Sequence, residues 1–220
     1  MFVLAEFRDT VRVPPDKFKE DSRTNIITQI EQHYGGKVVP GVGLCVCLDR
    51  IIKADEEAIF PNDGAAFIKV HFSYIVFCPH EGELLTGNVV HCSPVHGLIV
   101  HMGFFGDISI PPGLLPEPSI FIEADDNGLP GWVWQFKDED TGAVEEMPIS
   151  LGDKIRFAVD RLKYQSKDDV KPNPGNKPED DTDMKKTVTM DSAVTDRFAS
   201  SPLRLIGSIN SIGLGPLSWW

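Results

Sequence analysis

The stretch over residues 60–111 constrains the fold of this chain most, because it joins two different sheet patterns through one short connection. Over residues 68–76 apolar side chains alternate with polar ones, which is the period-two pattern of a strand with one buried face. After the turn-prone residues 79–83, a second β pattern runs over residues 84–110. The sequence therefore predicts an α+β protein, in which a small α/β module is followed at once by an all-β, barrel-like module.

The first module is expected to pack one helix on a sheet. Residues 3–13 have the pattern of a strand, and Pro14 and Pro15 stop the strand and preset the first turn of a helix. We expect that helix over residues 16–34, before a stop at Gly35. Its apolar stripe would be formed by Phe18, Ile26, Ile30 and Tyr34. Further extended segments are expected over residues 37–39, 43–52 and 58–60.

The second module begins with a hairpin whose turn lies at residues 93–97. Strict alternation along both strands sorts the side chains onto two faces. The face that fills the barrel is expected to hold Val90, Cys92, Leu98, Val100 and Met102. The opposite face is expected to hold Val89, His91, Ile99 and His101. Later barrel strands are expected over residues 132–136, 154–162 and 203–209.

Short motifs in a fixed order along the chain resemble those of a known family. They are Asp63-Gly64, Val70-His71-Phe72, Gly82-Glu83-Leu84-Leu85-Thr86-Gly87, Gly103-Phe104-Phe105, Asp107-Ile108 and Ile110-Pro111-Pro112. This order resembles the larger stalk subunit of cellular RNA polymerases, a family with archaeal and eukaryotic members. Both ends, over residues 1–12 and 213–220, look like the RNA polymerase III branch of that family. The resemblance covers nearly the whole chain except residues 166–200.

The resemblance implies two domains and a docking role for the first. It implies a truncated RNP-like domain over residues 1–80 and an OB-fold domain over residues 81–220. It also implies that the tip of the first domain docks on the polymerase core, and that the seam between the domains holds a smaller helical stalk protein. The docking candidates on this basis are Pro40, Gly41, Val42, Asn62, Asp63 and Gly64. The alternative is that these residues only close two hairpins, since such turns are common.

The same resemblance to an OB fold suggests a surface for single-stranded RNA. Histidine and phenylalanine rings stack on bases of any sequence, and Lys and Arg contact phosphates. The candidates are His91, His101, Phe104, Phe105, Lys154 and Arg156. For the two phenylalanines, packing in the core is the alternative. Arg161 and Lys163 fall on the strand face opposite Lys154 and Arg156, unless a bulge intervenes.

Charge limits how strongly this chain can bind nucleic acid alone. The net charge is −12, and residues 81–165 carry only five Lys and Arg against fourteen Asp and Glu. Tight nucleic-acid binding depends on neutralising phosphates with cations, so any contact with RNA is expected to be weak. The acidity favours a basic protein, such as an initiation factor, at least as much.

Residues 166–200 form a segment rich in Ser, Asp, Lys, Pro and Thr, which predicts a solvated, disordered insertion. No apolar run approaches the ~20 residues that span a bilayer, and residues 1–8 do not have the pattern of a signal peptide. We therefore expect a soluble, intracellular protein with reduced cysteines. The resemblance places it in the nucleus.

Catalytic and cofactor sites are not expected. His91, Cys92, His96 and His101 do not have the spacing of a tetrahedral zinc site, and no P-loop or Gly-x-Ser-x-Gly motif occurs. The leading hypothesis is a non-catalytic stalk subunit of RNA polymerase III that supports initiation. The alternatives are a free OB-fold RNA-binding factor, the equivalent subunit of RNA polymerase II or I, and an enzyme with an unrecognised site.

Overall fold

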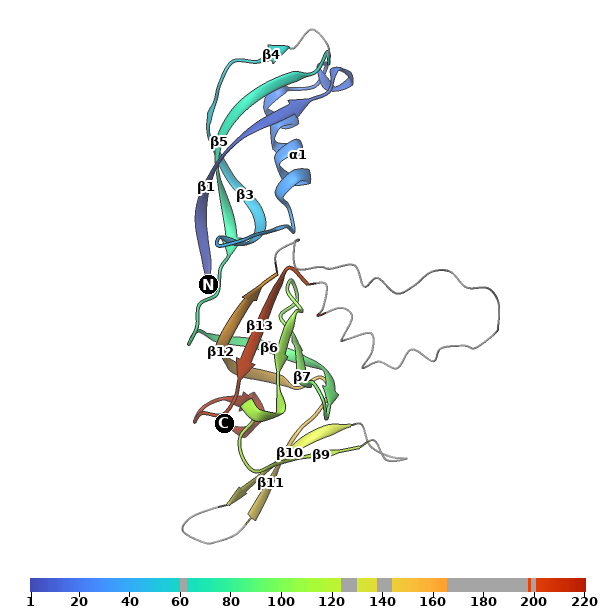
Figure 1. The fold of residues 1–220 in the computed structure, drawn as a ribbon, viewed down its shortest axis with the longest axis vertical. Helices are drawn as coiled ribbons and strands as arrows, with labels where there is room; N and C mark the ends of the chain where they lie inside the picture. The colour runs from blue at the N-terminus through green and yellow to red at the C-terminus, as the bar shows by residue number, and fades with distance from the viewer. Residues whose placement is uncertain (60–62, 124–129, 138–143, 166–197, 199–200) are drawn as a thin grey trace, which may run out of the picture. The chain divides into compact units, whose positions relative to one another are not determined.

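The computed structural model describes residues 1–220 except 60–62, 124–129, 138–143, 166–197 and 199–200 (Figure 1). The chain divides into two compact units, Met1–Pro79 and His80–Trp220, and each is described by itself. Within the described residues, the first unit contains helix α1 and a sheet, and the second is built mainly from β-strands and short 3-10 turns. The α+β class expected from the sequence is therefore confirmed.

The sheet of the first unit is antiparallel, with its longest strands side by side. Its strands are β1 (Phe2–Val13), β2 (Val38–Val39), β3 (Gly43–Ala54), β4 (Ala58–Ile59) and β5 (Ala66–Phe77). The order is β1-β5-β3-β2, and β4 also pairs with β5. β5 thus lies between β1 and β3, and β1 pairs with it over its whole length, from Phe2 opposite Phe77 to Val13 opposite Ala66.

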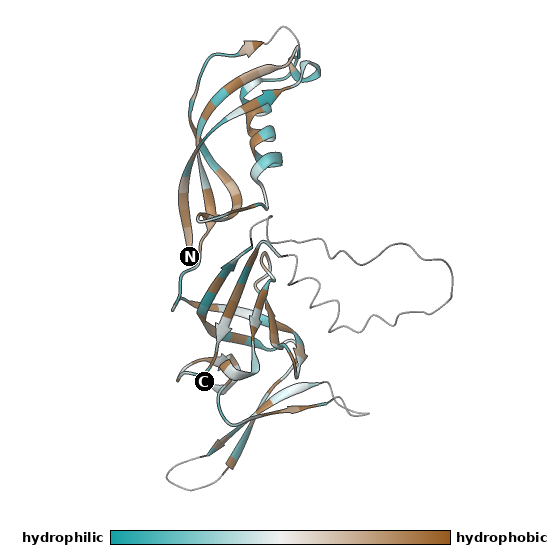
Figure 2. Ribbon diagram, viewed as in Figure 1, coloured by the Kyte–Doolittle hydropathy of each residue, from teal (hydrophilic) through white to brown (hydrophobic). Residues whose placement is uncertain are grey.

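Helix α1 (Ser22–Tyr34) covers one face of this sheet (Figure 1). The alternation predicted for β5 is present, and Figure 2 shows apolar and polar residues succeeding one another along the long strands. Ile68, Phe72 and Tyr74 are buried on the helix side, where they form one core with Ile26 and Ile30 of α1. The opposite face of the sheet carries no helix within the described residues.

The helix begins later than the sequence predicted. Residues Pro15–Lys17 form a separate 3-10 turn, η1, and Phe18 is exposed instead of starting the apolar stripe. The physical reason is the cap. The Asp21 carboxylate accepts a hydrogen bond from the backbone N–H of Thr24 at 3.1 Å, which satisfies a donor that the first turn leaves unpaired.

The second unit is centred on a closed five-stranded barrel. Its strands are β6 (Leu84–Ser93), β7 (Gly97–His101), β8 (Ile108–Ile110), β12 (Lys154–Tyr164) and β13 (Leu203–Ser208). They pair in the order β13-β8-β7-β6-β12, and β12 pairs with β13 to complete the ring, while β14 (Gly215–Pro216) is added beside β12. Five strands in a closed ring are the architecture expected of an OB fold.

The face assignment predicted for β6 is wrong at Val89 and Val90. Val89 is 1% exposed and fills the barrel, whereas Val90 is 52% exposed. A β-bulge causes this difference, because Val89 pairs with Val100 and His91 pairs with Ile99, which leaves Val90 as an extra residue. The strict period of two therefore breaks in the middle of the strand.

A separate three-stranded sheet holds the strand that the sequence placed in the barrel. Residues 132–136 lie in β10 (Gly131–Lys137), which pairs with β9 (Ser119–Ile122) and β11 (Val144–Ile149), and this sheet follows the 3-10 turn η2 (Pro112–Leu114). The prediction of a barrel strand here is wrong, because both neighbours of β10 belong to the small sheet. The Trp132 indole N–H donates to the Ser93 carbonyl at 3.3 Å and so joins the small sheet to the barrel.

Two segments near the C-terminus pack against the barrel unit. In the turn η4 (Leu217–Trp219), the Trp219 ring lies 5.4 Å from the Trp134 ring. Phe198 is only 6% exposed, and the Arg204 guanidinium lies 5.0 Å from the centre of its ring. The prediction that residues 166–200 are all solvated is therefore wrong at Phe198, and the rest of that segment lies outside the described residues.

Candidate interaction surfaces

The first docking candidate is the turn between β2 and β3. The backbone N–H of Val42 donates to the Val39 carbonyl at 3.0 Å and closes the turn. Pro40 and Gly41 are exposed at its tip, and Gly41 has a φ of +77°, a backbone conformation that side chains other than glycine rarely adopt. The turn thus presents a rigid, largely apolar tip.

The second docking candidate lies just before β5. Arg12 of β1 donates two hydrogen bonds to the Asp63 carboxylate, from Nε at 2.8 Å and from Nη2 at 2.6 Å. This bidentate pair holds the pKa of Asp63 below its usual value, mainly through the hydrogen bond. Gly64 follows with a φ of +67°. Asn62 lies outside the described residues.

The two docking candidates are not brought together. Because β3 and β5 are antiparallel, Leu44 at the start of β3 lies opposite Phe77 at the end of β5. The turn at Pro40 is therefore at one end of the sheet, while Asp63 and Gly64 are at the other, where β5 starts at Ala66. The separation along a twelve-residue strand is roughly 35 Å.

Three RNA candidates share the outer face of the barrel. On β6, Asn88 is the cross-strand partner of both His101 on β7 and Lys154 on β12, so these three side chains form one row. Arg156 follows Lys154 by two positions and lies opposite Thr86 on the same face. The interior side of β12 is formed by Ile155, Phe157 and Val159, all buried.

A second bulge extends the basic row along β12. Val159 pairs with Gly207 and Arg161 pairs with Ile206, so Asp160 is the extra residue and the alternation shifts after it. Arg161 and Lys163 therefore lie on the outer face with Lys154 and Arg156, and Lys163 lies opposite Arg204 on β13. The bulge that the sequence analysis named as the exception is present. We call Lys154, Arg156, Arg161, Lys163 and Arg204 the basic row.

The two phenylalanine candidates differ in how exposed their side chains are. Phe104 is 46% exposed, whereas Phe105 is 6% exposed and packs in the core. Of the pair, only Phe104 presents a ring at the surface. His101 Nδ1 accepts the backbone N–H of Gly103 at 2.9 Å, which fixes the imidazole beside the turn that carries Phe104. His91 pairs with Ile99 on the outer side of the hairpin and is half-buried.

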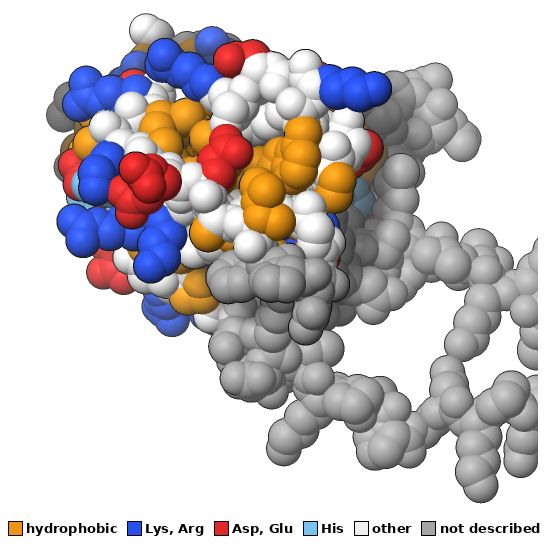
Figure 3. Space-filling view, turned by 90° about the horizontal axis from the view of Figure 1, so that it is seen from above, with side chains coloured by type: hydrophobic (Ala, Val, Ile, Leu, Met, Phe, Trp, Pro, Cys, Tyr) orange, Lys and Arg blue, Asp and Glu red, His pale blue; other side chains and the backbone are white. Residues whose placement is uncertain are grey.

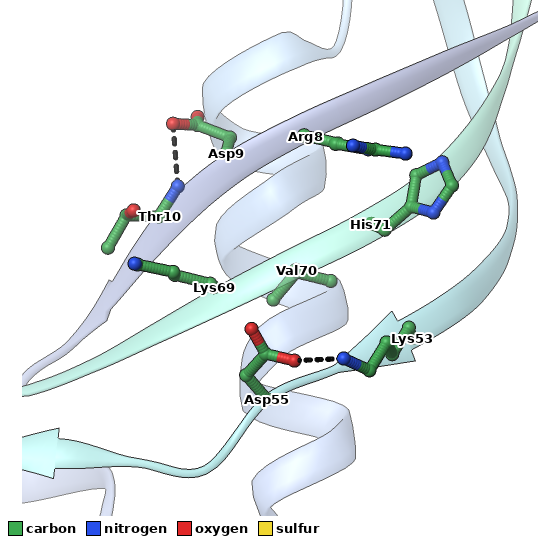
Figure 4. Close-up of a pocket in the computed structure, with 8 residues that line it drawn as sticks. All are labelled: Arg8, Asp9, Thr10, Lys53, Asp55, Lys69, Val70 and His71. Atoms are coloured by element: carbon green, nitrogen blue, oxygen red, sulfur yellow. Dashed lines mark hydrogen bonds and ion pairs between the residues drawn. The ribbon is translucent and has the colours of Figure 1, made fainter.

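A cluster that the sequence analysis did not single out lies on the open face of the first sheet (Figure 4). A pocket of about 460 Å³ is lined there by Arg8, Asp9, Thr10, Lys53, Asp55, Lys69, Val70 and His71. Figure 4 shows Arg8 and His71 pointing toward each other across β1 and β5, with α1 behind the strands. The sequence signal for this cluster was that Arg8, Thr10 and Arg12 occupy every second position along β1, which places these polar side chains on one face of the strand.

The described residues contain neither a group of three or more His, Cys, Asp or Glu side chains arranged to hold a metal ion nor a helix long and apolar enough to cross a membrane. The cysteines are unpaired. Burial raises the pKa of the Cys92 thiol to about 11, so it remains protonated at neutral pH.

Comparison with known proteins gives one consistent result. Residues 83–220 match the family model of RNA polymerase III subunit Rpc25, and residues 8–64 match the SHS2 domain found in the N terminus of Rpb7p and Rpc25p. DNA-directed RNA polymerase III subunit RPC8 of Bos taurus is 36% identical over 220 residues, which is all of this chain and 98% of the relative. The subunit of the same name in Saccharomyces cerevisiae is 29% identical over all of both chains.

A relative in another polymerase matches less of the chain. DNA-directed RNA polymerase II subunit RPB7 of Saccharomyces cerevisiae is 32% identical over 107 residues, which covers 47% of this chain and 61% of the relative. The polymerase III relatives above match from end to end, which agrees with the resemblance of both termini to that branch. The chain belongs to the family of RNA polymerase III subunit Rpc25.

Proposed function

We propose that this chain is a stalk subunit of RNA polymerase III that acts in the nucleus and supports initiation without catalysing a reaction itself. The observation that carries the proposal is the full-length match to polymerase III subunits at 36% identity. The geometry agrees with a binding role, because Pro40 and Gly41 lie in an exposed turn and Lys154 and Arg156 lie on the outer face of the barrel.

Docking on the polymerase core would use the first unit. Pro40, Gly41 and Val42 present one tip, and Asp63 and Gly64 present another. Since the two tips lie at opposite ends of the sheet, they would contact different surfaces of the assembly. One would meet the core subunits, and the smaller helical stalk protein is the second partner that we propose for this subunit.

The barrel would contact emerging RNA weakly or an initiation factor. The basic row supplies cations for phosphates, and Phe104 supplies an exposed ring for stacking on a base. The acidic residues of the rest of this unit limit its affinity for RNA and favour basic protein segments.

Native purification of the tagged chain from nuclear extract tests the assignment. A stalk subunit is expected to co-elute with polymerase III subunits and to occupy transfer-RNA genes in chromatin immunoprecipitation. Elution of all the protein near 24.4 kDa would instead show a free RNA-binding factor. Occupancy confined to messenger-RNA or ribosomal-RNA genes would show the polymerase II or I counterpart. Turnover of nucleotides or RNA by the isolated chain would contradict the non-catalytic role.

A further inference from the structure

The open face of the first sheet is ordered in rows that run across three strands. Leu4, Ile75 and Cys47 form an apolar row, because Leu4 and Cys47 are both cross-strand partners of Ile75. Four residues further along β1, Arg8 and Lys53 flank His71 in the same way. Thr10 and Lys69 form the next row. The face therefore changes from apolar to basic along the strands.

The basic end of this face departs from the charge of its surroundings. The first unit carries nine Lys and Arg against eleven Asp and Glu, so it is slightly acidic as a whole. The open face nevertheless holds the five cations Arg8, Arg12, Arg50, Lys53 and Lys69. Figure 3 shows Lys and Arg side chains at one side of this end of the unit, with Asp and Glu side chains among them and apolar side chains beside them.

Two of these cations form no ion pair within the described residues, although the pKa of Asp55 is lowered mainly by Lys53 and also by the charge of Lys69. Lys53 lies 2.7 Å from the Asp55 carboxylate, and Arg12 is paired with Asp63. His71 Nε2 lies 3.0 Å from the Glu6 carboxylate. Across the described part of the chain, neither Arg8 nor Lys69 forms an ion pair, and both line the 460 Å³ pocket. A ligand that carries carboxylates would form ion pairs with both Arg8 and Lys69.

The apolar row identifies the kind of partner. Leu4 is 62% exposed and lies about 13 Å along β1 from Arg8. Aliphatic side chains cannot stack on bases as aromatic rings do, and the ring of Phe2, two residues before Leu4 on the same face, already packs 5.4 Å from the Phe77 ring. This end of the face is therefore better suited to apolar side chains than to single-stranded RNA. The apolar row does suit the apolar side chains of a protein segment that also carries acidic residues. In that segment the acidic residues would follow the apolar ones by one or two helical turns, or by about four residues if the segment is extended.

We infer that the open face of the β1-β5-β3 sheet docks an acidic segment of another protein, with an apolar anchor on Leu4 and Ile75 and carboxylates on Arg8 and Lys69. The observations that carry this are charge complementarity and the fixed spacing of the two rows. The inference does not rest on the proposed docking tips or on the basic row of the barrel, although Arg12 on this face is paired with Asp63 of the second tip.

Binding of synthetic probes to the full-length chain tests it. The probe is a fluorescein-labelled twelve-residue peptide with two Leu near one end and three Asp four to eight residues later. We expect saturable binding by fluorescence anisotropy that weakens as salt rises. A peptide with Ser in place of both Leu should bind several-fold more weakly. A twelve-nucleotide oligouridylate is the competing probe, and equal or tighter binding of it at this face would overturn the inference.

Variants assign the binding to this face. Arg8→Ala with Lys69→Ala should weaken the peptide about tenfold, since both charge-assisted contacts are lost. The matched control, Arg23→Ala with Lys37→Ala, removes the same charge from exposed positions on α1 and just after it and should change affinity less than twofold. Leu4→Ser should weaken the Leu peptide but not its Ser counterpart. Equal effects of the two double variants would overturn the inference, as would no binding at low salt by a chain whose circular dichroism is native.

Discussion

Lys154 and His101 lie in one row across the barrel because Asn88 is the cross-strand partner of both. The two side chains come from β12 and β7, more than fifty residues apart in the chain, yet only one strand separates them. At the usual strand spacing their backbones are about 10 Å apart. A cation and an imidazole thus share one outer surface with the rest of the basic row.

This row predicts a defined loss of RNA binding. Replacing Lys154 and Arg156 by Ala should lower the affinity for a single-stranded oligouridylate about fivefold. The slope of log affinity against log salt should fall by about 1.4, because two phosphate contacts to a single strand disappear. Filter binding at several salt concentrations measures both quantities. A Lys17→Ala, Lys19→Ala variant on the first unit is the charge-matched control, and an equal loss there would show that the barrel surface is not the binding site.

The Arg12–Asp63 pair predicts a pH dependence with a definite sign. The pKa of Asp63 is lowered in the folded chain by the hydrogen bond from Arg12. The pair therefore contributes stability above the usual carboxyl pKa of 3.8, and that contribution is lost as pH falls through the lower folded value. Melting temperatures of the wild type and Arg12→Ala should differ slightly at pH 7 and converge in strong acid. A difference that persists at the lowest pH would contradict the linkage.

For Tyr74, we expect that removing the hydroxyl group does not lower the free energy of unfolding. Its hydroxyl oxygen is buried and has no hydrogen-bond partner in the described part of the chain. Tyr74→Phe should therefore leave the free energy of unfolding unchanged or raise it by up to about 1–2 kcal/mol. The control is Tyr34→Phe, which removes the 2.8 Å hydrogen bond from the phenol to Asp9 and should cost about 1 kcal/mol. Urea unfolding distinguishes the two, and a larger cost at Tyr74 would contradict the assignment.

In the segment between β12 and β13, we expect the length of the chain and the buried ring of Phe198 to affect stability separately. Gln165 N–H donates to the Pro202 carbonyl at 3.0 Å, so the two strands are already close where the segment leaves and returns. Replacing residues 167–196 by a short Gly-Ser link should leave the melting temperature within a few degrees. Phe198→Ala should instead cost about 2–4 kcal/mol, because a buried ring beneath Arg204 is removed. A large loss from the deletion would show that the segment supports the fold.

Sequence patterns predicted the strands of this chain better than their faces. The alternation over residues 68–76 identified β5 and its buried side because no bulge interrupts its pairing with β1. On β6 and on β12 one extra residue shifts the alternation, and a rule that assumes strict alternation cannot predict such an inserted residue. The pattern also could not tell that β10 pairs within a small sheet, since strand partners depend on contacts distant in sequence.

The candidate site was predicted in its residue types but not in its grouping. The spacing put Lys154 and Arg156 on one strand face, but that His101 shares their surface became visible only through the pairing of Asn88 with both His101 and Lys154. The two docking turns were grouped by resemblance, whereas the antiparallel pairing of β3 and β5 separates them. Arg8 and Lys69 were not singled out, because nothing local in the sequence indicates that β1 lies beside β5.

The extra residue at Asp160 makes the surface charge of the barrel depend on a residue count. If Asp160 were a regular strand residue instead of an extra one, Arg161 and Lys163 would turn inward and Leu162 outward, and the barrel would have to bury two cations. Deleting Asp160 would remove the bulge and leave Arg161 and Lys163 on the outer face, because Arg161 would then follow the inward-facing Val159 directly. A single-codon deletion at this point should therefore preserve the arrangement of cations on the barrel surface.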